Sequence, residues 1–349
     1  MTQTPQMEIL PTKPYDLIMN WRALNLDCQT CGGSGRVKFL KDGEPFCQYC
    51  ATGMQAPQPA PKGYTVKVFY DEHQSVGFND SFSPSASKPA KVVKSWQQLG
   101  IPMELRSFKP LTVDEMSLAH NRDYVEGVLS CRYPNGFGNT NPEVASALPW
   151  VCGSMVASAL HSLETGQLSF SPTSGAHHAC HNHGMCYCTF NFLAMAAIRA
   201  HQEGAKTVGI LDLDNHHGNG TENIINKLEL GFIQHYSFGS QFLKRGAAVK
   251  EWLGTLPGVV RKFENVDLLI VNAGVDPHVS DPLGGVLTTR EMAERDHIVF
   301  KLAAEMGLSV TVSLAGGYQQ DELGNIAPVL RLHDTTFKLA TAAFGTRYD

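Results

Sequence analysis

Three short, almost continuous apolar segments of the chain each end in residues with Asp, His or Tyr side chains. The segments are KTVGILDLD at 206–214, VDLLIVNAG at 266–274 and LSVTVSLAGG at 308–317. Runs of this length that are apolar at nearly every position are typical of strands buried on both faces of a parallel sheet. With helical patterns between them, these runs predict an α/β fold with helices on both faces of the sheet.

The clearest helical pattern lies at 288–307. Thr288 followed by Glu291 predicts a capping box at its start, and Gly307 predicts its end. Four further elements are predicted upstream: a strand at 64–71, a polar surface loop at 83–91, and helices at 112–130 and 141–166.

In an open parallel sheet, ligands bind at the carboxyl ends of the strands. The residues with chemically active side chains after the three runs are Asp212, Asp214, His216 and His217, then Asp276, His278 and Asp281, then Tyr318. A catalytic divalent metal needs about three protein ligands and one open position, so these residues predict a metal site at this edge. The alternative is a hydrogen-bonded loop network without a metal, in which Asp276 and His278 only shape the surroundings.

A tandem histidine pair, His177 and His178, lies in the stretch SGAHHACHNHG at 174–184. Adjacent residues cannot both point to one face of a strand, which predicts a loop. Imidazoles titrate near neutral pH, so a pair beside a metal site is suited to proton transfer. His181 and His183 have no predicted role.

The motifs SGAHHA, DLDNHHGNG, SDPLGG and AGGY stand in the order and approximate spacing of the histone deacetylase family, which includes bacterial acetylpolyamine amidohydrolases. From about residue 64 to 349 the chain resembles that family. The resemblance implies an arginase-like α/β fold. It also implies hydrolysis of an N-acyl amide on a lysine side chain, with acetyl as the expected acyl group.

Residue by residue, the resemblance implies a catalytic zinc ion held by Asp214, His216 and Asp281. His178 is then the general base and later the acid toward the leaving amine, with His177 as its electrostatic partner and Asp212 as an anchor. Tyr318 donates a hydrogen bond to the developing oxyanion.

The resemblance also implies a monovalent cation site, with potassium as the candidate, at Asp212, Asp214, His216, Ser237 and Phe238. The substrate tunnel is expected at Cys186, Tyr187, Gly316 and Gly317, with Phe242 as the candidate for the opposite aromatic wall. Cys186 and Tyr187 stand where the family usually has glycine and phenylalanine, which adds a hydroxyl to the tunnel. Asn219 can accept a hydrogen bond from His178 without a full negative charge, so it raises the pKa of that histidine less than aspartate would.

Two CxxC pairs, with 15 residues between them, stand near the amino terminus. Their cysteines are Cys28, Cys31, Cys47 and Cys50, and this spacing predicts a tetrathiolate structural zinc site. The alternative is four reduced thiols. Residues 50–63 are rich in Pro, Ala and Gln and predict a linker. We therefore expect a zinc-knuckle region at 1–60 and a catalytic domain at 61–349.

Composition excludes several function classes. The net charge is −5 and no basic stretch stands out, which argues against nucleic-acid binding. No apolar run approaches the roughly 18 residues of a membrane span, and the amino terminus lacks a signal-peptide pattern. The expectation is a cytoplasmic protein whose partner is an acylated lysine in a protein or peptide, or an acetylated small amine. An oligomer is compatible with the sequence.

Three rival functions follow from the same residues. The first is an acetylpolyamine amidohydrolase, for which YPNGFGNTNPE at 133–143 is a candidate entrance. The second is a catalytically silent module that binds acyl-lysine or polyamines. The third is an arginase-like ureohydrolase, which would need two metals and more ligands than the sequence offers.

Overall fold

The computed structural model of the chain describes residues 38–41, 44–47 and 64–345. The chain divides into two compact units, residues 1–58 and residues 59–349. In the first, strands β1 (Lys38–Lys41) and β2 (Glu44–Cys47) pair as an antiparallel hairpin. The predicted tetrathiolate zinc site lies outside the residues whose side chains are described, so it stays a prediction.

The second unit is built on a seven-stranded sheet in the order β4-β3-β5-β9-β8-β6-β7. Every strand pair in it is parallel. The strands are β3 (Val66–Phe69), β4 (Met103–Arg106), β5 (Ser169–Ser171), β6 (Val208–Asp212), β7 (Ile233–Ser237), β8 (Leu268–Ala273) and β9 (Val310–Leu314).

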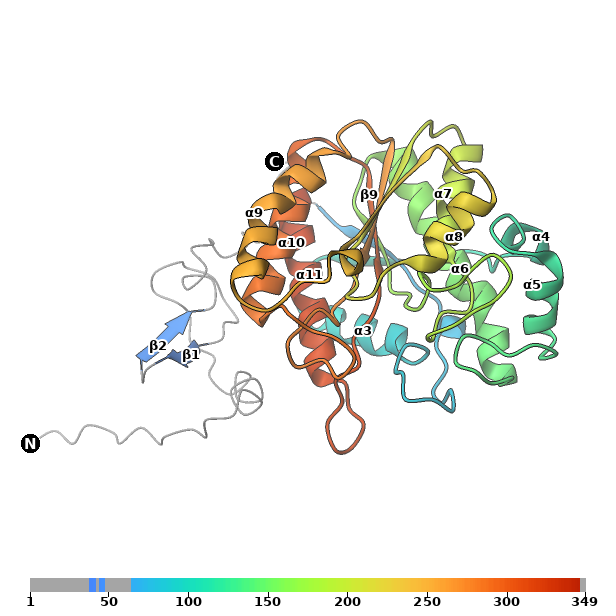
Figure 1. Cartoon of the computed structure of the whole chain (residues 1–349), viewed down its shortest axis with the longest axis horizontal. Helices are drawn as coiled ribbons and strands as arrows, with labels where there is room; N and C mark the ends of the chain where they lie inside the picture. The colour runs from blue at the N-terminus through green and yellow to red at the C-terminus, as the bar shows by residue number, and fades with distance from the viewer. Residues whose placement is uncertain (1–37, 42–43, 48–63, 346–349) are drawn as a thin grey trace, which may run out of the picture. The chain divides into compact units, whose positions relative to one another are not determined.

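Helices cover both faces of the sheet (Figure 1). One layer holds α3 (Lys88–Gln97), α9 (Ala247–Arg261), α10 (Thr289–Glu305) and α11 (Ala327–Gly345). The other holds α5 (Arg122–Leu129), α6 (Pro142–Thr165), α7 (Phe192–Gln202) and α8 (Asn219–Lys227). The short helices α4 (Val113–Met116), η1 (Glu72–Gln74) and η2 (Phe238–Gln241) lie in the connections.

The central strands are apolar at nearly every position because both of their faces are buried. Ile210 and Ile270 pack into the core beneath α6 and α7, whereas Leu211 and Val271 pack into the core beneath α9, α10 and α11. Neighbouring residues of a strand point to opposite faces, so each strand supplies both cores. The sequence prediction of a parallel sheet between two helical layers is confirmed.

Helix α6 is long and apolar enough to cross a membrane by length and composition, with a mean hydropathy of 1.3. In the structure, however, 61% of that apolar window is buried. Its Ser154 and Ser158 bond to Ser171 and Ser169 of β5, each over 2.7 Å. Buried hydroxyls with hydrogen-bond partners let the helix lie close to the sheet, which is the behaviour of a core helix.

The predicted capping box at Thr288 and the helix stop at Gly307 are both confirmed. The single helix predicted at 112–130 is wrong, because this segment forms α4 and α5. Asn121 caps the second of them by accepting a hydrogen bond from the Tyr124 backbone N–H. A second capping residue inside the segment breaks it, although the apolar spacing continues through the break.

Candidate functional site

Side-chain hydrogen bonds join three neighbouring strands at the carboxyl edge of the sheet. Asp212 at the end of β6 lies in register with Ser237 of β7 and Asn272 of β8, and Asn272 lies in register with Ser313 of β9. Ser313 Oγ donates to Asn272 Oδ1 over 2.9 Å, and Asn272 Nδ2 donates to Asp212 Oδ1 over 2.8 Å. The chain of bonds fixes the Asp212 carboxylate with one oxygen free for a further partner.

That partner is His177. Its Nδ1 donates to Asp212 Oδ2 over 2.8 Å, and the ring is buried. The neighbouring His178 donates from Nδ1 to Asn219 Oδ1 over 2.5 Å. The two ring centroids are 4.1 Å apart, in a loop as predicted. With Nδ1 engaged as a donor, a neutral His178 has its free lone pair on Nε2.

The two histidines have opposite shifts in pKa. Burial lowers the pKa of His177, but the charges of Asp212 and Asp214 outweigh burial and raise it to about 9. Burial and the neighbouring positive His177 lower the pKa of His178 to about 4. His178 is therefore neutral near pH 7 and can accept a proton, while His177 carries the positive charge.

Asp214, His216 and Asp276 form the group suited to hold a metal ion, with one ligand atom of each within 4.8 Å of the others. His216 Nδ1 lies 3.1 Å from Asp214 Oδ1 and 2.8 Å from Asp276 Oδ2. Its Nε2 donates to the Leu283 carbonyl over 2.8 Å, which leaves the Nδ1 lone pair of a neutral ring facing the carboxylates.

The electrostatics of this group fit a cation. The hydrogen bond to Asp214 and the close carboxylate of Asp276 raise the pKa of His216 to about 11, so the carboxylates bind a positive charge at Nδ1. Burial and the charge of Asp214 raise the pKa of Asp276. Asp276 Oδ2 is buried and no donor makes a well-directed hydrogen bond to it. A metal ion near His216 Nδ1 would satisfy this oxygen.

Two glycines let the backbone approach the carboxylates. A Cβ atom on Gly316 would lie 2.3 Å from Asp276 Cγ, and one on Gly274 would lie 2.5 Å from Asp214 Cα. The Gly316 N–H donates to Asp214 Oδ2 over 2.7 Å. Gly316 was predicted as part of the tunnel, and its observed contacts are with the carboxylates of the metal group.

Asp281, the third metal ligand implied by the family resemblance, lies beside this group. Its Oδ2 accepts the Tyr318 N–H over 2.8 Å, and its Oδ1 accepts the Leu283 N–H over 3.0 Å. Each oxygen keeps a second lone pair, so these bonds orient the carboxylate and leave it able to bind a metal ion. Burial raises the pKa of Asp281.

Tyr318 lies behind Gly316 and Gly317 at the end of β9 and is buried. Its ring centroid is 5.6 Å from that of Tyr187 and 6.3 Å from that of Phe82. Burial raises the pKa of the phenol, so the hydroxyl stays protonated and remains a hydrogen-bond donor.

Lys88 is a buried cation that the sequence prediction missed. Its Nζ donates to the Ala315 carbonyl over 2.7 Å and to Ser174 Oγ over 3.2 Å, and lies 6.0 Å from the Tyr318 ring centroid. The predicted surface loop at 83–91 is wrong here, because α3 begins at Lys88. Burial lowers the pKa of Lys88 to about 8, although the three nearby carboxylates oppose that shift.

Arg295 is a second buried cation, on α10. Its Nη1 donates to the carbonyls of Leu213 over 3.2 Å and of Gly274 over 2.9 Å, and its Nε donates to Asp296 over 2.8 Å. The guanidinium thus links the chain after β6 to the chain after β8. Its position in a helix offered no local signal for this role.

The predicted tunnel residues Cys186 and Tyr187 form a turn in which both have positive φ, 49° and 65°. The chain on either side of the turn meets at an isolated antiparallel bridge between Met185 and Cys188. Cys186 is exposed and Tyr187 is half-buried against Tyr318. Positive φ is costly for residues with a Cβ, which is consistent with glycine at the equivalent of Cys186 in the family.

The residues predicted to hold a monovalent cation come together at the end of β6 and β7. Asp212 is in register with Ser237, whose Oγ accepts the Gly218 N–H over 3.0 Å. Phe238 follows Ser237 and is buried. The cation itself stays a prediction.

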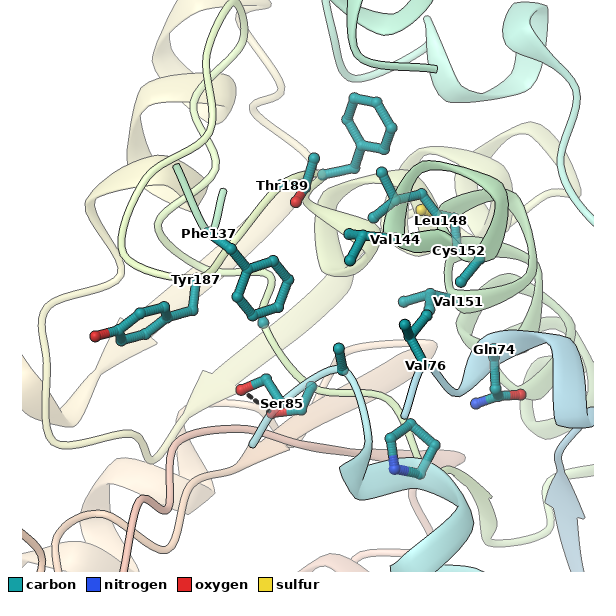
Figure 2. Close-up of a pocket in the computed structure, with 16 residues that line it drawn as sticks. Gln74, Val76, Ser85, Phe137, Val144, Leu148, Val151, Cys152, Tyr187 and Thr189 are labelled. Carbon is teal, nitrogen blue, oxygen red and sulfur yellow. Dashed lines mark hydrogen bonds between the residues drawn. The ribbon is translucent and has the colours of Figure 1, made fainter. Parts of the chain in front are cut away.

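Two hollows lie near residues of the candidate site. The first is a cavity of about 30 Å³ behind Tyr187, lined by Phe137, Val144 and Cys152 among others, and the Tyr187 hydroxyl points away from it (Figure 2). It has room for about one or two waters. The second is a groove of about 510 Å³ over His178 and His216, which is large enough for a ligand.

Comparisons with known proteins agree with this arrangement. The profile described as the histone deacetylase domain matches residues 84–242 and 246–331. A probable deacetylase of Methanothermobacter thermautotrophicus is 27% identical over 270 residues, which cover 67% of this chain and 80% of that protein. The acetylpolyamine amidohydrolase of Mycoplana ramosa is 28% identical over 174 residues, which cover 42% of this chain and 50% of that protein.

Two solved structures have a similar fold. The HDA15 HD domain aligns with a TM-score of 0.64 at 20% identity, covering 81% of this chain and 90% of that one. The acetylpolyamine aminohydrolase from Burkholderia pseudomallei aligns with a TM-score of 0.60 at 16% identity, covering 80% of this chain and 99% of that one. At these identities the likeness concerns the fold alone.

Proposed function

The chain belongs to the histone deacetylase family and is a hydrolytic deacetylase, and we propose that it uses zinc to hydrolyse an N-acetyl amide on a lysine side chain. One observation carries the proposal. The tandem histidines, the carboxylates with His216, and Tyr318 follow four different strands but gather at one edge of the sheet. His177 Nε2 lies 3.6 Å from Asp214 Oδ1, and the Tyr318 N–H donates to Asp281 Oδ2 over 2.8 Å. Hydrolysis of an amide needs a base, an electrophilic site and an oxyanion donor together.

His178 is the residue proposed to move the proton. Its ring is neutral at pH 7, its Nδ1 is held by Asn219, and it lines the groove. In the reaction, Nε2 accepts a proton from the attacking water and then returns it to the leaving amine. His177, held by Asp212, places a positive charge beside it and keeps its pKa low enough for this exchange.

Tyr318 is proposed to stabilise the oxyanion. Its hydroxyl stays protonated, and its backbone is held by Asp281 on one side and through Ala315 by Lys88 on the other. A fixed donor aimed at the developing negative charge commonly contributes several kcal/mol of barrier lowering.

The zinc ligands proposed are Asp214, His216 and Asp281, with Asp276 adjacent. Two anionic oxygens and one imidazole nitrogen form a donor set that zinc accepts. The chemistry that zinc supplies at such a site is polarisation of the amide carbonyl and a lowered pKa of water.

The proposal is tested by amine release from acetyl-lysine peptides, longer acyl-lysines and acetylated polyamines, with purified protein loaded with zinc. Tyr318→Phe is the matched variant, because it removes only the hydroxyl. We expect turnover of at least one acetyl-lysine peptide and a loss of about 100-fold or more in kcat for the variant.

Turnover that does not depend on Tyr318 would contradict the assigned role of that residue. If zinc-loaded protein binds the compounds but hydrolyses none of them, the rival function as a silent binding module is favoured instead.

A further inference from the structure

The groove over His178 and His216 is lined by two kinds of residue. Its polar lining consists of His178, Asn215, His216, His217 and Asn219, and its glycine and apolar lining comes from residues within 238–243 and 285–286. None of the residues that line it is Asp, Glu, Lys or Arg. The donors and acceptors it offers are neutral amides, imidazoles and backbone groups.

The carboxylates nearest the groove are engaged with its histidines, and a cation lies at its edge. Asp214 Oδ1 and Asp276 Oδ2 lie 3.1 and 2.8 Å from His216 Nδ1. Arg245 is fixed along the edge of the groove, donating to the Gly285 carbonyl over 3.2 Å and to the Val279 carbonyl over 2.9 Å. The nearby Glu222 carboxylate lies 3.1 Å from His217 Nε2 and is engaged there. A polyamine carries ammonium groups that need anionic or carbonyl partners, and a cation at the edge opposes its approach.

Phe242 is the most exposed large apolar side chain in the described part of the chain, with 88% of its surface accessible. Its φ is 47°, in the left-handed region that a bulky residue rarely adopts. Exposure of an aromatic ring and an unfavourable backbone conformation both cost free energy. Residues held in an unfavourable backbone conformation cluster at active sites and ligand-binding sites.

Three further residues with exposed apolar side chains contact Tyr318 or residues that line the groove. Phe82 stacks near Tyr318, Met185 accepts a hydrogen bond at sulfur from Asn219, and the Leu283 carbonyl accepts the bond from His216. All three side chains are exposed. They come from three segments far apart in sequence, so only the folded chain brings these apolar side chains to the site.

We propose that this groove binds the polypeptide next to an acetylated lysine, with an aromatic or aliphatic side chain of that polypeptide packed against Phe242. The inference rests on the proposed function and narrows its substrate class. Peptide N–H and C=O groups match the side-chain amide of Asn215, which lines the groove, whereas a polyamine chain beyond its acetyl group offers no acceptors and carries unmatched charge. The groove therefore selects an apolar neighbour over a cationic one.

The test compares acetyl-lysine peptides that differ only in the residue beside the lysine, Phe, Ala, Glu or Lys, together with N-acetylputrescine. Both kcat/KM with zinc-loaded full-length protein and binding by fluorescence anisotropy with Tyr318→Phe are measured. We expect the Phe peptide to exceed the Ala peptide by about tenfold in both, because part of an aromatic ring is removed from water. N-acetylputrescine is expected to rank last.

Phe242→Ala should reduce the Phe-to-Ala ratio to near one. The control is Leu323→Ala, because Leu323 is 87% exposed and does not line the groove, and it should leave the ratio unchanged. A ratio near one in the unaltered protein, or faster turnover of N-acetylputrescine than of every peptide, would overturn the inference while the proposed hydrolysis stands. If nothing is hydrolysed, the proposed function fails and the anisotropy ratio still decides what the groove binds.

Discussion

Asn272 of β8 donates a 2.8 Å hydrogen bond to Asp212 at the end of the neighbouring strand β6. The other oxygen of Asp212 accepts from His177, so a residue in the middle of the sheet orients a histidine in a loop. Ser313 on β9 extends the same connection by one strand. The proton-transfer pair is thus fixed by sheet register and by three successive side chains.

Asn272→Ala removes the donor and leaves Asp212 Oδ1 with only the Asp214 N–H, 3.2 Å away. The cost of an underbonded buried carboxylate predicts a loss of about 1–3 kcal/mol in the free energy of unfolding. Urea unfolding measures the loss of stability. Steady-state kinetics measure kcat and kcat/KM, and kcat is expected to fall because His177 loses its orientation. Ser313→Ala, one step further from the histidine, should have a smaller effect on both, and an equal effect would contradict the ordering.

Asn219→Asp should shift the pH dependence of the reaction. A carboxylate beside His178 Nδ1 favours the imidazolium and raises a pKa that is now lowered to about 4. The base must be neutral to accept a proton, so the acid limb of kcat/KM should move to higher pH by about one unit or more.

Asn182→Asp is the matched control for that shift. Asn182 Oδ1 lies 2.9 Å from His183 Nδ1 on the exposed part of the same loop. The change adds the same charge beside a histidine with no assigned role. Movement of the acid limb in this variant would show that general electrostatics, and not the His178 contact, sets the profile.

The third zinc ligand can be identified by comparing Asp281→Asn with Asp276→Asn. We expect Asp281→Asn to lower zinc affinity by about 100-fold and Asp276→Asn by about tenfold, since a supporting carboxylate matters less than a ligand. Competition with a chromogenic chelator measures both affinities without any substrate. The reverse order would assign the ligand set to Asp214, His216 and Asp276, the three that lie closest together in the structure.

Gly316→Ala places a Cβ between 2.3 and 2.6 Å from the carboxyl atoms of Asp276. Backbone and carboxylate must separate, so we expect a loss of about 1–3 kcal/mol in stability and weakened zinc binding. Gly254→Ala on α9 is the control, because nothing lies within 4 Å of its added Cβ. Removing a helical glycine should leave stability equal or raise it by about 0.5–1 kcal/mol. Similar losses in both variants would refute the steric argument.

The apolar runs were sufficient to predict strands β6, β8 and β9, because burial on both faces makes nearly every residue of such a strand apolar. Strands β5 and β7 were not predicted. Ser169 and Ser171 of β5 are buried polar residues with partners on α6, and β7 is only partly buried. Their conformations depend on tertiary contacts that no local pattern records.

The positions of residues at the carboxyl edge were predictable where the residues follow strands or match a family motif, as with His177, His178 and Tyr318, whereas their roles stay predictions. Lys88, Asn272 and Arg295 were missed, because each belongs to a helix or strand and reaches the site only through packing. A lysine in a Ser/Pro-rich stretch is usually exposed, and nothing local indicates that this one is fully buried. Residues that support the site in this way can be identified only from the folded structure.

The strands that carry the site are neighbours in space but far apart along the chain: β5 near residue 170 pairs with β9 near residue 311, and β9 pairs with β8. In a partly folded chain whose strand β9 has not yet paired with β5, the histidine loop and Tyr318 are not brought together. Contacts of such sequence separation form slowly. During refolding, recovery of enzymatic activity should therefore follow the recovery of helical signal, and its rate should report completion of the sheet.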